Sequence, residues 1–222
     1  MLKLKKPNWL QHLQFLSVPQ IRLSGKPRST FNKRKIALLK KHYFNANCIV
    51  EYGSGGSTIL SLEHSVNKIY SVETDPNWVD FVSDYPLCKE SIATGRLVLE
   101  HFDIGKIRGH GRPKTKSHIH SWSRYASDIW KRIREDEMTN EVEGVLIDGR
   151  FRVAAALYSL LQAPDATLYF DDFTNRKESY GIVLQHLDVI DEADNLVALK
   201  RKANCKFPEV VENLCNYILQ VR

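Results

Sequence analysis

Short apolar runs alternate with longer amphipathic segments over most of the chain. Five of the runs are rich in aliphatic and aromatic residues and have the length of buried strands. They lie at 48–51, 68–72, 97–102, 145–147 and 167–170. A weaker run at 195–199 predicts a sixth strand.

Helices are predicted in the segments between these strands. They lie at 57–62, 122–130, 153–162 and 208–219, and one more begins at Asp75-Pro76. Asp75 is a suitable N-cap and Pro76 suits the first helical position, whereas Pro164 ends the helix before it. Strands that alternate with helices build βαβ units. We therefore expect an α/β fold: a Rossmann-like, doubly wound, mostly parallel sheet with helices on both faces.

The first 45 residues have a different character. They are basic and helix-like, with a break at 23–27, and Ser29 or Thr30 is in position to cap a helix through 35–39. We interpret residues 1–45 as a helical segment that covers the sheet and residues 46–222 as the main domain. Homodimer formation through the N-terminal segment is left open.

Length and composition narrow the class of protein. The chain has 222 residues, which suits one α/β domain. No stretch approaches the roughly 20 apolar residues of a membrane helix, and the N-terminus lacks the apolar core of a secretory signal. The four cysteines form no Cys-x-x-Cys pair, so a reducing, cytoplasmic compartment is expected. The formal net charge of +6 favours acidic partners such as phosphates, uronic acids or nucleic acid.

The segment 104–121 is irregular and strongly basic. It has no acidic residue, and its cations are Lys106, Arg108, Arg112, Lys114 and Lys116. Loops of this length in a compact domain are usually functional or disordered. We weigh two interpretations: a lid that recruits an acidic substrate, and a solvated flexible loop.

A glycine-rich loop follows the first strand. Gly53, Gly55 and Gly56, between a strand and a helix, allow the backbone to approach a ligand closely. Glu73 lies about 20 residues further on, at the end of the second strand, where a carboxylate can bind ribose hydroxyls. The combination predicts a nucleotide or nucleoside site, and an ordinary tight turn is the alternative. Thr58 stands where the dinucleotide fingerprint has glycine, which disfavours NAD.

The acid before this loop makes the pattern recognisable. Glu51-x-Gly53-x-Gly55 resembles motif I of class I S-adenosylmethionine-dependent methyltransferases, with Ser57 in place of the usual third glycine. The resemblance implies that S-adenosylmethionine is the cofactor, that Glu73 binds its ribose and that Asp103 contacts adenine. The residues expected at the cofactor are Glu51, Gly53, Ser54, Gly55, Ser57, Glu73, Asp103 and Trp122.

Two further features belong to this resemblance. Trp122 either covers the adenine or, with Tyr125 and Ile129, forms the stripe on one helix face that is typical of core packing. The stretches EYGSGGST at 51–58 and DGRFR at 148–152 together resemble an uncharacterised bacterial group of methyltransferase-like proteins, over roughly residues 46–173. That group does not indicate a substrate.

Three carboxylates follow the fourth and fifth strands. Asp148, Asp171 and Asp172 would repel each other at the shared edge of the sheet unless a metal ion, an arginine or a raised pKa compensates. Metal-dependent O-methyltransferases of small molecules place acids here, which implies a divalent cation such as Mg²⁺ bound by all three residues. The alternatives are a general base at this position and simple loop caps.

Arg150 and Arg152 follow Asp148 directly. Each is a candidate to hold an anionic group of the substrate through a bidentate contact. An internal ion pair with Asp171 or Asp172 is the alternative for either arginine.

These features together favour an S-adenosylmethionine-dependent methyltransferase. A hydroxyl acceptor needs a base or a metal ion, which the carboxylates can supply, so we expect O-methylation of a small polyhydroxylated or anionic acceptor such as a saccharide. The alternatives are N-methylation of RNA or protein and a non-catalytic nucleoside-binding module. Nucleic acid is the less favoured partner, because Asp148-Gly149-Arg150-Phe151 differs from the motif of base amino-methyltransferases.

Overall fold

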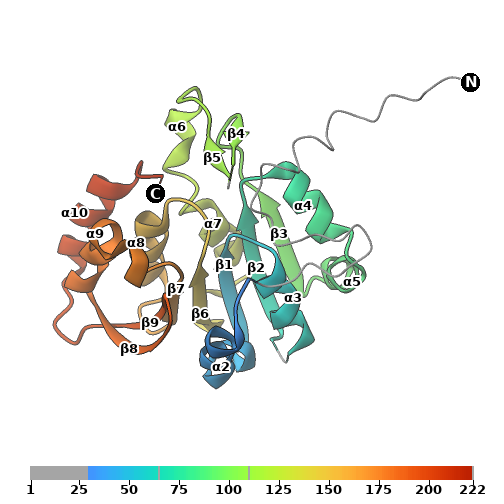
Figure 1. The fold of residues 1–222 in the computed structure, drawn as a ribbon, viewed down its shortest axis with the longest axis horizontal. Coiled ribbons are helices and arrows are strands. Elements are labelled where there is room, and N and C mark those ends of the chain that lie inside the picture. The colour runs from blue at the N-terminus through green and yellow to red at the C-terminus, as the bar shows by residue number, and fades with distance from the viewer. Residues whose placement is uncertain (1–29, 65, 110, 222) are drawn as a thin grey trace, which may run out of the picture.

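The computed structural model describes residues 30–64, 66–109 and 111–221. Within them, seven strands form one sheet in the order β3-β2-β1-β6-β7-β9-β8 (Figure 1). The strands are β1 (Cys48–Tyr52), β2 (Lys68–Glu73), β3 (Leu97–His101), β6 (Val142–Ile147), β7 (Thr167–Phe170), β8 (Leu187–Ala193) and β9 (Leu196–Arg201). Strands β3, β2, β1, β6 and β7 pair in parallel, whereas β9 is antiparallel to both β7 and β8.

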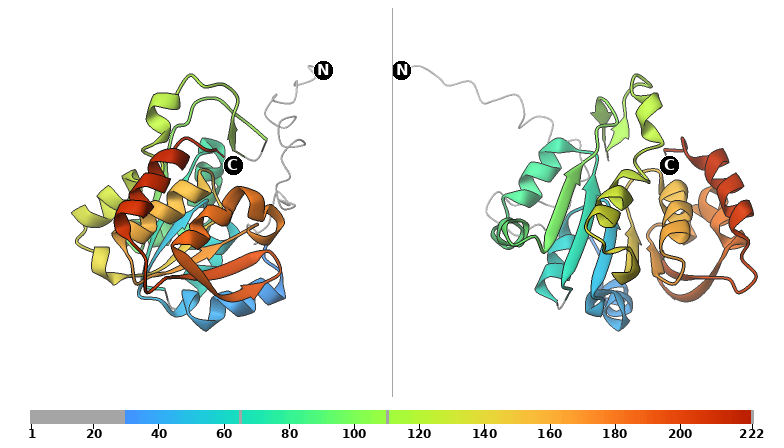
Figure 2. Two further views of the ribbon diagram at one scale, coloured as in Figure 1. Left: turned by 90° about the vertical axis from the view of Figure 1, so that its left-hand side faces the viewer. Right: turned by 180° about the vertical axis from the view of Figure 1, so that it is seen from behind.

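Helices cover both faces of the sheet, as Figure 2 shows from two sides. One face carries α7 (Asp128–Glu135), α8 (Arg152–Gln162) and α10 (Phe207–Tyr217). The other face carries α2 (Lys33–Lys41), α3 (Gly56–Glu63), α4 (Pro76–Ser83) and α5 (Pro86–Ala93). The expected doubly wound, mostly parallel α/β fold is confirmed.

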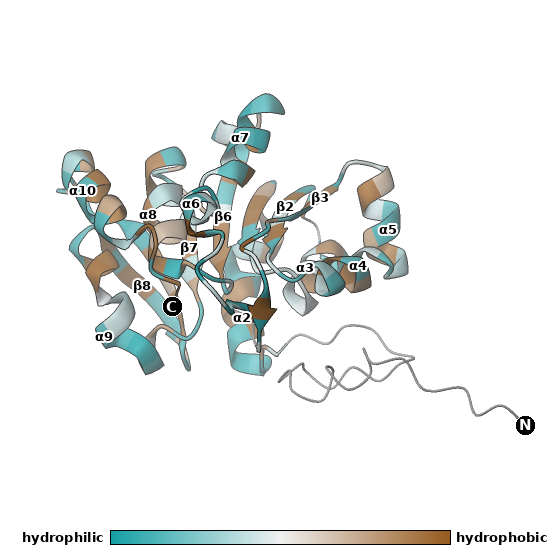
Figure 3. Cartoon of the chain, turned by 90° about the horizontal axis from the view of Figure 1, so that it is seen from above, coloured by the Kyte–Doolittle hydropathy of each residue, from teal (hydrophilic) through white to brown (hydrophobic). Residues whose placement is uncertain are grey.

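Alternation of side chains along the central strand explains the two layers. Val50 and Tyr52 of β1 pack into the core on the side of α7 and α8, whereas Ile49 packs into the core on the side of α3. All five residues of β1 are buried, which is typical of a strand covered on both faces. Figure 3 shows hydrophobic residues gathered along the strands and on one side of the helices.

The predicted helix starts are mostly correct. Asp75 caps α4 by accepting a hydrogen bond from the backbone N–H of Asn77 at 3.0 Å, with Pro76 at the first position. Helix α8 ends before Pro164. The N-terminal helix is α2, and its cap is Asn32, whose side chain accepts from the N–H groups of Arg34 and Lys35. Thr30 was therefore the wrong cap for α2, and Ser29 lies outside the described residues.

The structure corrects three further expectations. The edge strand β8 was missed, because only Leu187 and Ala193 at its two ends are buried and its middle lacks an apolar pattern. The helix expected at 122–130 is divided, since α6 (Ile119–Trp122) is followed by turns before α7 begins. The basic segment is ordered as a small hairpin of β4 (Ile107–Arg108) and β5 (Arg112–Pro113) instead of an irregular loop.

The remaining short elements connect the main ones. They are η1 (Tyr43–Asn45), η2 (Thr139–Glu141), η3 (Thr174–Arg176), α9 (Lys177–Tyr180) and η4 (Gly181–Gln185). Of the helices in the described part of the chain, none is long and apolar enough to cross a membrane. Cys48 of β1 is fully buried.

The order of the strands identifies one position as special. The chain moves outward from β1 to β2 and β3 on one side and from β6 to β7 on the other. Ligands of such sheets bind outside the carboxyl ends of the strands, at the point where the order reverses. In this chain that point lies between β1 and β6, where Gly53 and Asp148 follow the two strands.

Candidate functional site at the carboxyl edge of the sheet

Two glycine turns meet backbone to backbone between β1 and β6. A Cβ atom on Gly53 would lie 2.9 Å from the backbone nitrogen of Gly149 and 3.0 Å from its Cα. Gly53 also has φ +95°, which side chains strongly disfavour. Because both obstacles are backbone atoms, neither turn can move without the other. The contact between the two turns therefore requires glycine at both positions, and it lies at the carboxyl edge of the sheet.

The rest of the glycine loop is held by a tryptophan that the sequence did not single out. Trp78 of α4 donates from its indole nitrogen to the carbonyl of Ser54 at 2.7 Å. Its ring would lie 3.3 Å from a Cβ on Gly55, whose φ is +153°. The hydroxyl of Ser54 is buried and has no hydrogen-bond partner among the described residues, so a polar group of the predicted cofactor loop remains available.

The Glu51 side chain is buried, and the hydrogen bonds it makes are to neighbouring hydroxyl groups. It is fully buried at the end of β1, and its carboxylate accepts from the hydroxyls of Ser57, Thr58 and, at 3.0 Å, Ser71. Burial raises its pKa to about 7, and the three hydroxyls limit the rise. Glu51 and Ser57 were both expected at the cofactor. Their mutual bond fixes the start of α3 against β1 and β2, and their contact with the cofactor stays a prediction.

This burial predicts how stability depends on pH. The pKa of Glu51 is 4.5 in an ordinary setting and about 7 in the fold, so the folded state binds the proton more tightly. The proton on Glu51 therefore stabilises the folded state, and this stabilisation is fully present below pH 4.5. As the pH rises through 7 it is lost, which lowers the free energy of unfolding by up to about 3 kcal/mol. Urea unfolding at pH 5 and pH 8 is expected to show this loss, and a smaller loss for Glu51→Gln. The control is Glu90→Gln, which changes an exposed carboxylate and should lose as much stability as wild type. Equal losses of stability in wild type and Glu51→Gln would contradict the raised pKa of Glu51.

Glu73 ends β2 with one carboxylate oxygen occupied. Its Oε1 accepts from the backbone N–H groups of Thr74 at 2.6 Å and Asp75 at 3.1 Å and from the hydroxyl of Thr74 at 3.2 Å. Its Oε2 has no hydrogen-bond partner among the described residues. Burial raises the pKa of this carboxyl. The N–H groups fix one oxygen and leave the other to accept from a ligand, which suits the predicted contact with ribose hydroxyls.

Asp103 and Trp122 lie beyond β3, at the base of the hairpin. Asp103 is exposed, accepts from the N–H of Gly105 at 2.7 Å and has His118 Nε2 at 3.6 Å. Trp122 is 4% exposed and donates from its indole nitrogen to the carbonyl of Ile104 at 3.1 Å. Its ring packs against Phe151, which accords with the core-packing interpretation. Asp103 keeps an open side for a ligand, whereas most of Trp122 is already covered.

The three carboxylates after β6 and β7 form a charge-balanced cluster, called here the carboxylate cluster. Asp171 is buried and accepts from Lys35 Nζ at 2.6 Å. Asp172 accepts from Asn195 at 2.8 Å and has the guanidinium groups of Arg152 and Arg176 each at 3.3 Å. Three cations therefore match three carboxylates: Lys35 comes from a distant part of the chain, whereas Arg152 and Arg176 each lie four residues from an acid they pair with.

The predicted metal site is not present in this arrangement. Among the described residues, no group of three or more His, Cys, Asp and Glu side chains is placed to hold a metal ion. The repulsion that a cation was expected to relieve is relieved by Lys35, Arg152 and Arg176 instead. The described residues therefore do not support Mg²⁺ bound by Asp148, Asp171 and Asp172.

Asp148 differs from the other two acids. Its side chain is 30% exposed and pairs with Arg152 at 3.0 Å through one oxygen. Burial raises its pKa to about 7, with Asp171 and Asp172 adding to the rise and Arg152 opposing it. A partly open carboxyl with this pKa can accept a proton near neutral pH. Of the cluster, Asp148 alone keeps the features of a general base.

The two arginines after Asp148 have opposite environments. Arg152 is 2% exposed and donates to the carbonyls of Gly149, Asp171 and Asp148 at 2.9, 2.6 and 2.8 Å. It therefore connects β6 to β7 and has no free side towards a substrate, so its contacts do not support the predicted substrate role. Arg150 is half-buried, and its guanidinium makes no hydrogen bond or ion pair with a described residue. Burial and the nearby charge of Arg152 lower its pKa.

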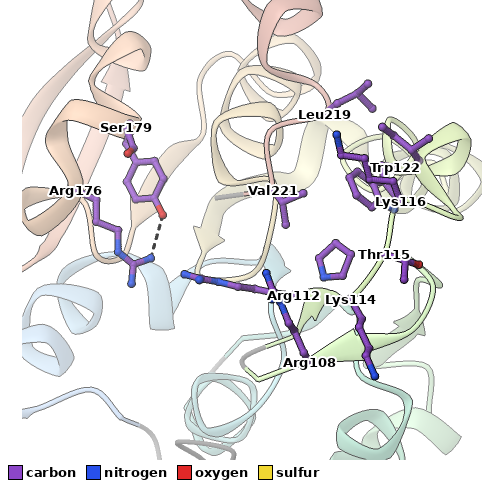
Figure 4. A pocket seen from close by; sticks show the side chains of 13 residues that line it. Arg108, Arg112, Lys114, Thr115, Lys116, Trp122, Arg176, Ser179, Leu219 and Val221 are labelled. Atoms are coloured by element: carbon purple, nitrogen blue, oxygen red, sulfur yellow. Dashed lines mark hydrogen bonds between the residues drawn. The ribbon is translucent and has the colours of Figure 1, made fainter.

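A basic pocket of about 630 Å³ lies beside this edge (Figure 4). Its cations come from the hairpin segment and from η3, and they are Arg108, Arg112, Lys114, Lys116 and Arg176. The remaining wall includes Trp122, Tyr180 and two residues after α10, Leu219 and Val221. The volume is in the range of small-molecule sites. The segment that the sequence identified by its charge thus lines a cavity.

Comparisons with known proteins support the fold. A methyltransferase-like protein from Silicibacter pomeroyi is 26% identical, with a TM-score of 0.72 over 87% of this chain and 98% of that chain. An O-methyltransferase from Bacillus cereus in complex with SAH is 14% identical, with a TM-score of 0.49 over 90% of this chain and 93% of that one. An RNA methyltransferase from Salinibacter ruber in complex with S-adenosyl-L-homocysteine is 14% identical, with a TM-score of 0.44 over 78% and 93%.

The second and third similarities have TM-scores below 0.5, so they carry no argument about the acceptor. No protein-family model matches the sequence, and no curated protein matches it significantly. The first similarity confirms the predicted methyltransferase-like Rossmann fold and supports the predicted S-adenosylmethionine-dependent methyltransferase.

Proposed function

We propose that the chain transfers a methyl group from S-adenosylmethionine to a hydroxyl oxygen of a small polyhydroxylated or anionic acceptor. The observation that carries the proposal is the pair of closely packed glycine turns at Gly53 and Gly149, at the carboxyl edge of the sheet, beside a Glu73 carboxylate with one open oxygen. A nucleoside suits this edge, because its ribose hydroxyls would donate to Glu73 and the glycine turns add no side chains there.

A buried hydroxyl supports the fit to a cofactor. The hydroxyl of Ser54 has no hydrogen-bond partner among the described residues, whereas the Tyr125 hydroxyl faces the backbone N–H of Arg150. A Cβ on Gly149 would collide with the Tyr125 hydroxyl, which places Tyr125 directly against the turn. Buried polar groups are rarely left unsatisfied. We propose Gly53, Ser54, Gly55 and Glu73 as cofactor contacts, with Asp103 on the adenine side.

The chemistry requires a base and little else from the protein. When held by Ser54 and Glu73, the cofactor would supply an electrophilic methyl group, and the protein's own residues would align the acceptor and remove its proton. We assign Asp148 as the base that takes the hydroxyl proton, because it is partly open and its pKa is near 7. Asp171 and Asp172 then orient the site through Lys35 and Arg152 rather than touching the acceptor.

Arg150 is the remaining polar group at this edge. Its guanidinium is unpaired among the described residues and half-buried, so an anionic group would relieve an unfavourable environment. We propose that Arg150 binds an acidic group of the acceptor or the carboxylate of the cofactor.

Calorimetry with S-adenosylhomocysteine, and with NAD for comparison, tests the cofactor. We expect micromolar binding of S-adenosylhomocysteine and none of NAD. Lack of S-adenosylhomocysteine binding at millimolar concentration would refute the proposal. Binding without any methyl transfer to a panel of hydroxyl acceptors would favour the non-catalytic module. Transfer to RNA or protein nitrogen would favour the alternative acceptors.

Replacement of Glu73 by glutamine tests the ribose contact. We expect S-adenosylhomocysteine to bind roughly tenfold to a hundredfold more weakly, because hydrogen bonds to a charged group contribute about 1.5–3 kcal/mol. The measurement is calorimetry on Glu73→Gln and on Glu90→Gln, an exposed carboxylate of α5. Unchanged affinity of Glu73→Gln would remove Glu73 from the site.

Three predictions from the sequence remain proposals without a structural argument. They are the membership of the bacterial group with the EYGSGGST and DGRFR stretches, the cytoplasmic location and the homodimer. The division at residue 45 is likewise a proposal, although α2 packs against the sheet through the ion pairs of Arg34 with Asp194 and Lys41 with Asp191.

A further inference from the structure

The basic pocket concentrates positive charge on one cavity. Arg108 and Arg112 are paired across the β4–β5 hairpin, so their side chains start from adjacent positions. Arg176 lies across the pocket from them in Figure 4. No acidic side chain of the described residues lines the cavity. Like charges that converge without a counter-charge repel each other. An anion bound between them replaces this repulsion with attraction, so the cavity favours a negatively charged ligand.

The cations are also of the right kind for phosphate. Arginine donates two parallel hydrogen bonds to a phosphate in a fixed plane, and lysine adds a compact charge. Arg176 is only partly committed, because its guanidinium lies 3.3 Å from Asp172 and donates to the Tyr180 hydroxyl at 3.2 Å. Arg108 and Arg112 make no hydrogen bond or ion pair with a described residue.

The position of the pocket connects it to the proposed methyl donor. Gly111 at the hairpin turn lies against Thr74, because a Cβ on Gly111 would be 2.9 Å from the Thr74 hydroxyl. Thr74 is the residue that fixes Glu73. Arg112 and Tyr180 line the pocket and also influence the pKa of Arg150 at the switch point. The pocket therefore opens beside both halves of the candidate site.

We propose that the basic pocket binds the methyl acceptor through a phosphate group, so that the substrate is a small phosphorylated molecule with a free hydroxyl. This inference rests on the proposed methyltransferase function. A small molecule is favoured over single-stranded RNA by the aromatic residues of the pocket. Sequence-tolerant RNA binding uses exposed rings on which bases stack, whereas Trp122 is 4% exposed and Tyr180 is fully buried.

A charge-matched pair of variants tests the pocket. The pocket variant is Arg108→Gln/Arg112→Gln/Lys114→Gln, and the control removes three exposed lysines elsewhere, Lys33→Gln/Lys40→Gln/Lys89→Gln. The probes are inorganic pyrophosphate, glucose 6-phosphate and glucose, titrated calorimetrically at constant ionic strength. We expect the two phosphates to bind and glucose not to bind. The pocket variant should lose at least tenfold in affinity and the control less than twofold.

Each other outcome has a defined meaning. Equal losses of affinity in both triple variants would overturn the inference, because the phosphates would then respond only to the net charge of the protein. Absence of any phosphate binding would also overturn it. A short single-stranded RNA that binds more tightly than pyrophosphate, and is lost only in the pocket variant, would also overturn it in favour of RNA. Arg112→Gln alone is the measurement if the triple variant unfolds at a lower temperature.

The same samples separate this inference from the proposed function. Binding of S-adenosylhomocysteine without phosphate binding would remove the phosphorylated acceptor and leave the methyltransferase proposal intact. Phosphate binding that the pocket variant loses, without S-adenosylhomocysteine binding, would confirm an anion site and refute the methyltransferase proposal.

Discussion

Replacement of Arg152 by alanine is expected to lower the free energy of unfolding by about 3–5 kcal/mol. Arg152 is 2% exposed and donates to three backbone carbonyls as well as to Asp148 Oδ1 at 3.0 Å. Without it, these carbonyls and the Asp148 carboxylate lose this donor inside the fold, and Asp172 keeps only Asn195 and Arg176. Uncompensated buried charge is among the most costly defects in a protein.

The neighbouring arginine provides a matched control for this prediction. Arg150→Ala removes the same side chain two residues away, where the guanidinium has no described partner, and should change stability by less than about 1 kcal/mol. Urea unfolding of both variants gives the comparison. Arg152→Lys retains the charge but loses the planar fork, and should be intermediate. Similar stabilities of Arg152→Ala and Arg150→Ala would show that Arg152 does not connect β6 to β7 energetically.

Gly53→Ala is expected to weaken S-adenosylhomocysteine binding by roughly tenfold to a hundredfold, because accommodating the added methyl group costs about 1–3 kcal/mol. The new Cβ would lie 2.9–3.1 Å from backbone atoms of Gly149 and Asp148, so the two turns must separate. Such a separation moves the loop away from Glu73 and Asp148 together. The variant should also unfold at a lower temperature, since φ +95° is strained for alanine.

Gly95→Ala distinguishes these two effects. Gly95 has φ +74°, but nothing lies within 4 Å of a Cβ at this position. It therefore carries the backbone strain without the collision, and should lose stability without losing affinity for S-adenosylhomocysteine. Calorimetry and thermal unfolding of both variants are the measurements. Equal affinities of the two variants would mean that the close approach of the two turns is not needed for binding.

The central sheet and the glycine loop could be predicted because their signals are local. Fully buried strands such as β1 are continuous apolar runs, and positive φ angles at Gly53 and Gly55 require glycine. Strand β8 could not be predicted in this way. It lies at the edge of the sheet, and Val189 and Ile190 in its middle are 44% and 52% exposed, so no alternating pattern marks it.

The partners of the site residues could not be predicted because they are far apart in sequence. Lys35 and Asp171 are 136 residues apart in the sequence. Trp78 lies on α4, whereas the Ser54 carbonyl to which it donates lies in the loop after β1. The sequence showed that three carboxylates would need compensation and offered Arg152 as an ion-pair partner, but only the fold shows that Lys35 and Arg176 join it. Similarly, the charge of segment 104–121 was evident, whereas its two-residue strands have no recognisable pattern.

The β4–β5 hairpin has a consequence for the order of binding. Gly111 touches the loop that holds Glu73, and the next residue, Arg112, lines the basic pocket. A single peptide unit thus separates the wall of the proposed nucleoside site from the wall of the proposed acceptor site. Any shift of the hairpin on occupation of one site changes the shape of the other. Thermodynamic linkage then requires cofactor and acceptor to alter each other's affinity by the same factor.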